Sequence, residues 1–132
     1  MSGLALVLYD ETTDGRQLNK VELRLVSQAM TLRDLISQRI KQEVDEYNHK
    51  QQEVFQGLVQ PTDTEAVLNG YRMHRKRKIS YDNQLEKAVR AFESNGFFVL
   101  LDDRQVEDLD EPLVFTEHSH VSFVKLVPLV GG

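Results

Sequence analysis

The sequence predicts an α+β fold, on three observations. A short apolar run at 4–9 and an alternating segment at 18–26 flank the turn dipeptide Asp14-Gly15, which is typical of an antiparallel hairpin. From Leu32 onward, apolar residues recur at helical spacing. Two later apolar runs, 97–101 and 121–127, are expected to be strands, the first because it is too short and too bulky for a helix.

The predicted hairpin buries one face. Its second strand points Val21, Leu23 and Leu25 one way and Glu22 and Arg24 the other. The residues between the two strands, 10–16, are polar and are expected to form the connection.

The first helix is expected to begin after Thr31, which can cap it, with Asp34 placed favourably for the helix dipole. Its charged residues form a solvated face. The pattern is expected to continue beyond Tyr47, and the apolar stripe then comprises Leu32, Leu35, Ile36, Ile40, Val44, Tyr47, Val54, Phe55 and Leu58.

The middle of the chain is predicted to be helical. Pro61 ends the first helical pattern, and a short helix over 65–69 would stop at Gly70. A clear helix then opens at Ser80 or Asp82 and closes at Asn95-Gly96. Its apolar stripe is Leu85, Ala88, Val89 and Phe92.

Two charged segments have several interpretations. The basic cluster, Arg72 to Lys78, is more typical of a solvated linker than of a binding site for nucleic acid or for an acidic partner. Residues 102–112 are acidic and are expected to form a loop, which could pair with the basic cluster or face a basic partner.

Composition excludes several classes of protein. The chain has 132 residues, enough for one domain with an insertion, and it has no cysteine, so a disulfide framework, a zinc ribbon and a thiol nucleophile are excluded. The net charge of −5 argues against nucleic-acid or membrane binding by the whole surface. No targeting segment is recognisable, which predicts a cytoplasmic protein.

Several motifs in the last third of the chain carry a family resemblance. Val99-Leu100-Leu101 precedes Arg104-Gln105-Val106-Glu107-Asp108, Leu113 follows, and an apolar strand runs into Leu129-Val130-Gly131-Gly132. This order resembles the third strand, turn, core leucine and diglycine tail of the ubiquitin-like modifiers. The helix start at Thr31-Leu32 also fits that family.

The resemblance implies a ubiquitin-like β-grasp fold (hairpin, helix and mixed sheet) with a helical insertion between the first helix and the third strand. The expected organisation is a single domain over 1–132, an insertion over 48–96 and a tail over 128–132. Lys125 stands where the family has a core leucine, which indicates a register shifted by one residue. Pro128 and Val130 replace the family's basic tail residues, as in divergent modifiers of bacterial conjugation operons.

The resemblance also implies a conjugation site at Gly131 and Gly132. Glycines at the end of a chain can thread a narrow channel to an enzyme-bound ATP. Recognition of the tail would fall on Pro128, Leu129 and Val130. The implied partners are an E1-like activating enzyme, an E2-like conjugating enzyme, a deconjugating peptidase of the JAB type or another class, and target proteins.

A partner-binding patch is implied at Leu100 together with Val124 or Leu126. Residues 97–101 are apolar at every position, whereas a strand with one solvent-exposed face should alternate apolar and polar residues. Either the helix carrying Leu85 and Phe92 covers the second face, or a partner does.

The sequence carries no catalytic constellation, so an enzyme is the least expected class. The pair His118 and His120 lacks further ligands at metal-binding spacing and is expected to lie in a solvated turn, and no cofactor is expected. Two other functions remain open beside a protein modifier. One is a sulfur carrier of the same fold, and the other is an interaction module that is never conjugated.

Overall fold

The hairpin forms as predicted, with a longer first strand. The structure is a computed structural model and describes residues 3–50, 52–67 and 70–126. Strand β1 (Leu4–Thr12) pairs antiparallel with β2 (Gln17–Leu25). Gly15 adopts a φ of 90° in the turn, a value that favours glycine. Asp10 was expected in the connection but lies within β1, where the pairing shifts register between Asp10 and Glu11.

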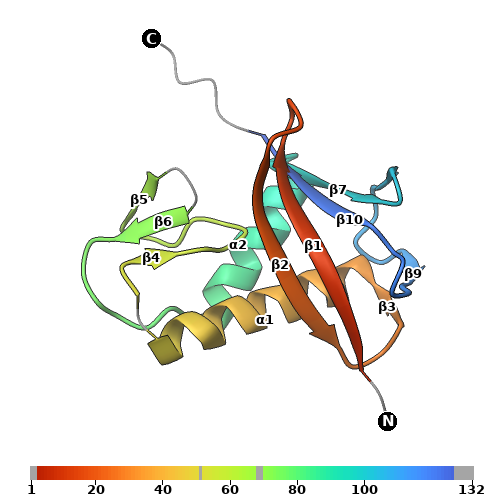
Figure 1. Ribbon diagram of the computed structural model, residues 1–132. Helices are drawn as coiled ribbons and strands as arrows, with labels where there is room; N and C mark the ends of the chain where they lie inside the picture. The colour runs from red at the N-terminus through yellow and green to blue at the C-terminus, as the bar shows by residue number, and fades with distance from the viewer. Residues whose placement is uncertain (1–2, 51, 68–69, 127–132) are drawn as a thin grey trace.

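The main sheet is mixed and has five strands in the order β2-β1-β10-β7-β8. Its central pair, β1 and β10 (Val121–Lys125), is parallel, and β7 (Phe97–Leu101) lies antiparallel on the other side of β10 (Figure 1). The predicted loop over 102–112 in fact contains the short strand β8 (Arg104–Val106), because Asp102 and Asp103 take left-handed φ values that turn the chain back on β7.

Helix α1 (Leu32–Lys50) begins with the predicted cap. The Asp34 N–H donates to Thr31 Oγ1 at 3.1 Å, and the Thr31 N–H donates to Asp34 Oδ2 at 3.1 Å. The helix ends at Lys50, so its predicted continuation is wrong. Phe55 instead lies in β4 (Val54–Phe55), where its ring still packs edge-on against Tyr47 at 5.6 Å.

The insertion is only partly helical, which corrects the prediction of a helical insertion over 48–96. A small sheet in the order β4-β6-β5 precedes the second helix, with β5 (Thr64–Val67) and β6 (Gly70–Met73) antiparallel. The predicted short helix over 65–69 is therefore wrong: a segment of that length cannot nucleate a helix without tertiary support, whereas pairing with β6 satisfies the backbone groups of β5. Figure 1 shows the small sheet beside the C-terminal end of α1.

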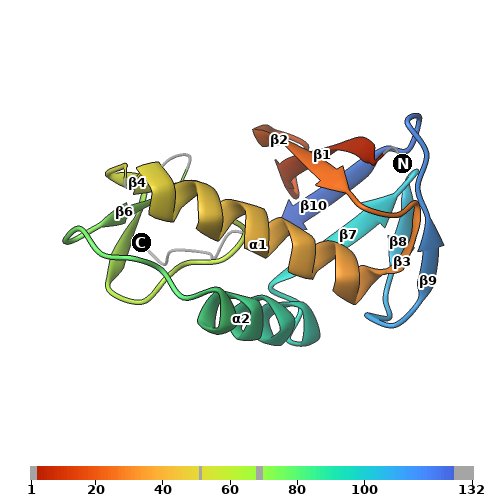
Figure 2. The same cartoon turned by 90° about the horizontal axis from the view of Figure 1, so that it is seen from below.

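Helix α2 (Tyr81–Glu93) forms where the apolar stripe predicted it. Ser80 caps it, with its Oγ accepting from the Asn83 N–H at 3.3 Å, and Asn95 closes it with a φ of 62°. A two-stranded sheet of β3 (Ala29–Thr31) and β9 (Pro112–Val114) lies at the other end of α1, and Leu113 of β9 is buried as the family motif implied. Both helices lie on one side of the five-stranded sheet (Figure 2).

Candidate partner-binding face and buried charge cluster

The face of the five-stranded sheet that points away from both helices, here called the outer face, is the first candidate site. Strand alternation places Leu6 and Leu8 of β1 in the core with Val99 and Phe123. The residues of opposite parity on the three central strands form the outer face, which comprises Ala5, Val7, Tyr9 and Glu11 of β1, Ser122 and Val124 of β10, and Phe98 and Leu100 of β7.

Helix α2 covers the inner side of β7. The Phe92 ring lies 5.8 Å from that of Phe97, which in turn lies 5.9 Å from that of Phe123 in the core. The prediction that this helix covers the second face of β7 is therefore wrong, because α2 packs on the side that α1 also occupies. Phe98 and Leu100 are half-buried on the opposite side.

The structure places the three predicted patch residues in different surroundings. Leu100 and Val124 are diagonal neighbours on the outer face, since Leu100 pairs with Ser122 and Val124 with Phe98. Val124 is only 5% exposed between its cross-strand neighbours and offers little surface to a partner. Leu126 is 43% exposed and lies one residue beyond β10, where it lines a groove on the insertion side.

Sequence reasoning missed the aromatic part of the outer face. The half-buried Tyr9 stacks on His120, with ring centroids 4.6 Å apart and an interplanar angle of 13°. His120, expected in a solvated turn, is held by Asp102, which accepts from its backbone N–H at 2.8 Å. Strict alternation along 4–9 could have identified Val7 and Tyr9 as an outward-facing pair.

The predicted conjugation and tail-recognition residues lie outside the described residues. These are Pro128, Leu129, Val130, Gly131 and Gly132. The ladder that leads toward them reaches Leu126, whose N–H donates to the carbonyl of Gly96 at 3.2 Å.

No family model, curated protein or solved structure matches this chain. Within the described ranges, no group of three or more histidine, aspartate or glutamate side chains could hold a metal ion. Neither of the two helices described is long and apolar enough to cross a bilayer. A functional proposal therefore depends on the residues and their geometry.

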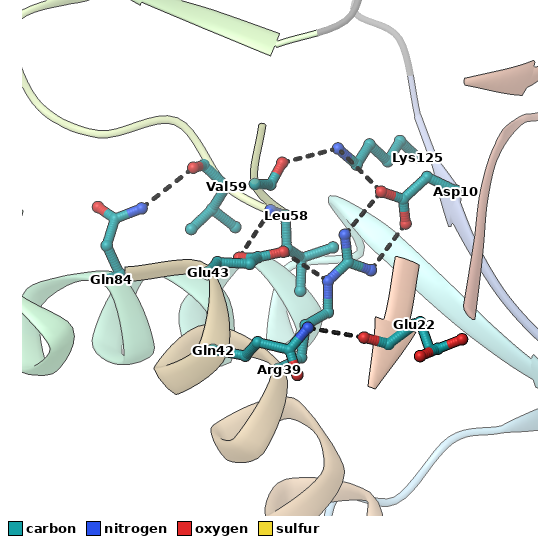
Figure 3. A network of polar contacts seen from close by, with 10 residues as sticks. Asp10, Glu22, Arg39, Gln42, Glu43, Leu58, Val59, Gln84 and Lys125 are labelled. Carbon is teal, nitrogen blue, oxygen red and sulfur yellow. Dashed lines mark hydrogen bonds and ion pairs between the residues drawn. The ribbon is translucent and has the colours of Figure 1, made fainter. Parts of the chain in front are cut away.

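A second candidate site is a buried cluster of charges between the main sheet, α1 and the insertion (Figure 3). Both carboxylate oxygens of Asp10 accept from the two terminal nitrogens of Arg39, at 2.7 and 2.6 Å. Arg39 Nε donates to Glu43 Oε2 at 2.7 Å, and Glu43 Oε1 accepts from the Leu58 N–H at 3.3 Å. Lys125 Nζ donates to the Gly57 carbonyl at 3.1 Å and lies 4.0 Å from Asp10 Oδ2.

Burial and ion pairing oppose each other in this charge cluster, and the carboxylates of Glu43 and Asp10 keep the pKa of Arg39 above its usual value despite burial. Arg39 is 1% exposed and Asp10 is fully buried. Burial raises the pKa of Glu43, although Arg39 opposes the shift, and burial lowers the pKa of Lys125. The Arg39 guanidinium also lies 4.7 Å from the centre of the Phe123 ring. Two acids and two bases balance one another, so the cluster has the character of a structural network that joins the insertion to the sheet.

Part of the basic cluster pairs with acids of the insertion itself. Arg72 lies 3.8 Å from Glu65, and His74 Nδ1 lies 2.9 Å from Asp63 Oδ1. The acids of 102–111 pair elsewhere: Asp110 with Arg33 at 3.0 Å and Glu111 with Arg104 at 2.8 Å. Among the ion pairs of the described residues, none joins these two segments.

Proposed function

We propose that the chain has the ubiquitin-like β-grasp fold and acts as a protein modifier. The observation that carries this proposal is the strand order β2-β1-β10-β7-β8, with β1 and β10 parallel at its centre and α1 packed on one face. The motifs around Leu100 and Leu113 lead us to expect a hairpin, a crossing helix and a last strand inserted beside the first strand. The insertion adds to this core without interrupting a strand of the main sheet.

The proposed chemistry takes place at the carboxyl group of Gly132. A carboxylate oxygen attacks the α-phosphate of ATP on an activating enzyme, and pyrophosphate leaves. A cysteine thiolate of that enzyme displaces AMP to form a thioester, which passes to the thiol of a conjugating enzyme. An amine of a target protein then displaces the thiol and forms an amide bond. The chain needs no catalytic residue of its own, and its own lack of cysteine is compatible with each step.

Two surfaces are proposed to guide these steps in the cytoplasm. The apolar tail residues Pro128, Leu129 and Val130 would enter the channel of the activating enzyme. The outer face around Leu100 would bind partner enzymes or receptors, and a deconjugating peptidase would reverse the attachment.

The test is to express the tagged chain in its native cells and to search for adducts by mass spectrometry. The wild-type chain should appear on other proteins through Gly132, and deletion of Gly132 should abolish these adducts, because it withdraws the carboxylate by roughly 3.3–3.6 Å. Gly131→Val should do the same by adding a branched side chain. Lys41→Met, a change on the exposed side of α1, is the matched control and should conjugate normally.

The outcomes separate the alternatives. A carboxyl group that gains the mass of one sulfur, without protein adducts, would replace the proposal with a sulfur carrier. A chain that keeps its function without Gly131 and Gly132 would be an interaction module. The half-buried apolar residues of the outer face favour this second candidate, which predicts that Leu100→Lys, and not loss of the diglycine, abolishes partner capture.

A further inference from the structure

A groove of about 500 Å³ lies between the hairpin, the insertion, α2 and the end of β10. Its walls are largely apolar and include Val59, Tyr71, Ala91 and Phe97, which come from four different segments. A volume of this size is typical of small-molecule sites, which usually combine apolar walls with a few polar groups. The groove exists only because the insertion packs beside the main sheet.

The charge in this groove has one sign. Arg16, Lys87 and Lys125 belong to its lining, and no acidic side chain does among the described residues. This is unexpected in a chain of net charge −5. By contrast, the hollow of about 670 Å³ next to the buried charge cluster is lined by acids and bases together.

Lys87 and Lys125 direct their hydrogen bonds to neutral oxygens. Lys87 Nζ donates to the Gln60 carbonyl at 3.2 Å and to Thr62 Oγ1 at 2.7 Å. Lys125 Nζ donates to the Gly57 carbonyl at 3.1 Å, and Asp10 balances its charge from 4.0 Å. Burial lowers the pKa of both lysines. An anion in the groove would stabilise the charged form of these side chains, Lys87 most of all because it has no carboxylate partner among the described ion pairs.

We propose that this groove binds a free medium-chain fatty acid, with its alkyl chain against Val59, Tyr71 and Phe97 and its carboxylate at Lys87. Lys125 and Arg16 add positive potential at the same site, although Asp10 lies 4.0 Å from the Lys125 ammonium and Asp14 lies 3.5 Å from the Arg16 guanidinium. An apolar groove attracts an alkyl chain by burial, and the uniformly cationic lining selects an anionic head over a neutral or cationic one. This site is separate from the outer face and makes no use of the diglycine.

The probe is decanoate, kept below its micelle concentration and titrated into the full chain by calorimetry. Decanoate should bind and should raise the unfolding temperature progressively as its concentration increases, because it binds the folded state. Decylamine has the same alkyl chain with a positive head and should do neither. Lys87→Met keeps the apolar stem but removes the charge, and should weaken decanoate binding by about tenfold or more.

Two further variants locate the site. Lys41→Met makes the same change of charge outside the groove and should leave the affinity unchanged. Ala66→Trp fills the groove from an exposed position of β5 and should block binding without disturbing the core. The proposal is overturned if decanoate does not bind, if decylamine binds equally well, or if Ala66→Trp and Lys87→Met both keep wild-type affinity. Because this assay requires no conjugation enzyme, its failure is distinguishable from failure of the proposed modifier function.

Discussion

Arg39→Met tests whether the buried charge cluster is as dry as its geometry indicates. Methionine retains the apolar stem beside Phe123 but removes the cation from Asp10 and Glu43. Because Arg39 is 1% exposed and Asp10 is fully buried, the two carboxylates would lose their partner where they have almost no contact with solvent. Removing one member of a buried pair costs about 3–5 kcal/mol of unfolding free energy. The midpoint of a urea titration should then fall by roughly 2 M, for an m-value of about 2 kcal/mol/M.

The pH dependence of this variant provides a second test. Burial already raises the pKa of Glu43, and loss of Arg39, which opposes that shift, should raise it further. A carboxyl group whose pKa is higher in the folded than in the unfolded state stabilises the fold fully only below its unfolded-state pKa, about 4. That contribution is lost as the pH rises. The deficit of Arg39→Met relative to wild type should therefore shrink as the pH falls from 7 toward 4.

Two controls make the result interpretable. Arg33→Met removes an exposed partner of Asp110 and should cost no more than about 1 kcal/mol. Adding Glu43→Gln to Arg39→Met leaves Asp10 and Lys125 as a balanced pair and should restore much of the lost stability. A loss below about 1 kcal/mol for Arg39→Met, or an unchanged pH profile, would refute a dry cluster at this site.

Three further predictions concern the core, the insertion and the basic cluster. Leu23→Ala, at a residue that is 1% exposed, should cost about 2–5 kcal/mol in urea unfolding, whereas Val26→Ala, at 86% exposure, should cost less than about 0.5; equal effects would contradict the assigned face of β2. Asn48→Ala should cost about 1–3 kcal/mol in thermal unfolding, because its amide pairs both the N–H and the carbonyl of Ile79; no change would mean that water replaces these bonds. The chain should not bind duplex DNA at physiological ionic strength, and a salt-sensitive change in fluorescence anisotropy that depends on residues 72–78 would show otherwise.

The elements that could be predicted are those with a long or unambiguous pattern. The alternation around Leu23, the helical stripe from Leu32 to Tyr47 and the capped stripe before Asn95-Gly96 all identify elements that the structure contains. The small sheet could not be predicted, because its strands have two to four residues and pair only with one another. Periodicity cannot distinguish such segments from the end of a helix, and Phe55 is buried in either arrangement.

The candidate site was predictable only in part, because its key pairs are distant in sequence. The sequence pattern places Arg39 and Glu43 on a solvated helix face and Asp10 in a polar connection. The ion pair between Asp10 and Arg39 joins positions 29 residues apart, which no local pattern can reveal. The expected register shift at Lys125 is also wrong: β10 pairs without interruption from Val121 to Lys125, and the ammonium finds its partners in Asp10 and Gly57.

These departures from local rules have a common physical cause, which is the insertion. A helix packed on a sheet would normally bury an apolar side chain at each of the positions of Asp10, Arg39 and Lys125. Here the insertion contributes backbone groups at this junction, the Gly57 carbonyl and the Leu58 N–H, and these groups need polar partners when they are buried. Charged residues on the sheet and on α1 provide those partners, and they also set the register in which the insertion packs. The apolar, cationic groove beside Lys125 is a consequence of that packing, so the buried cluster and the proposed fatty-acid site depend on the same junction.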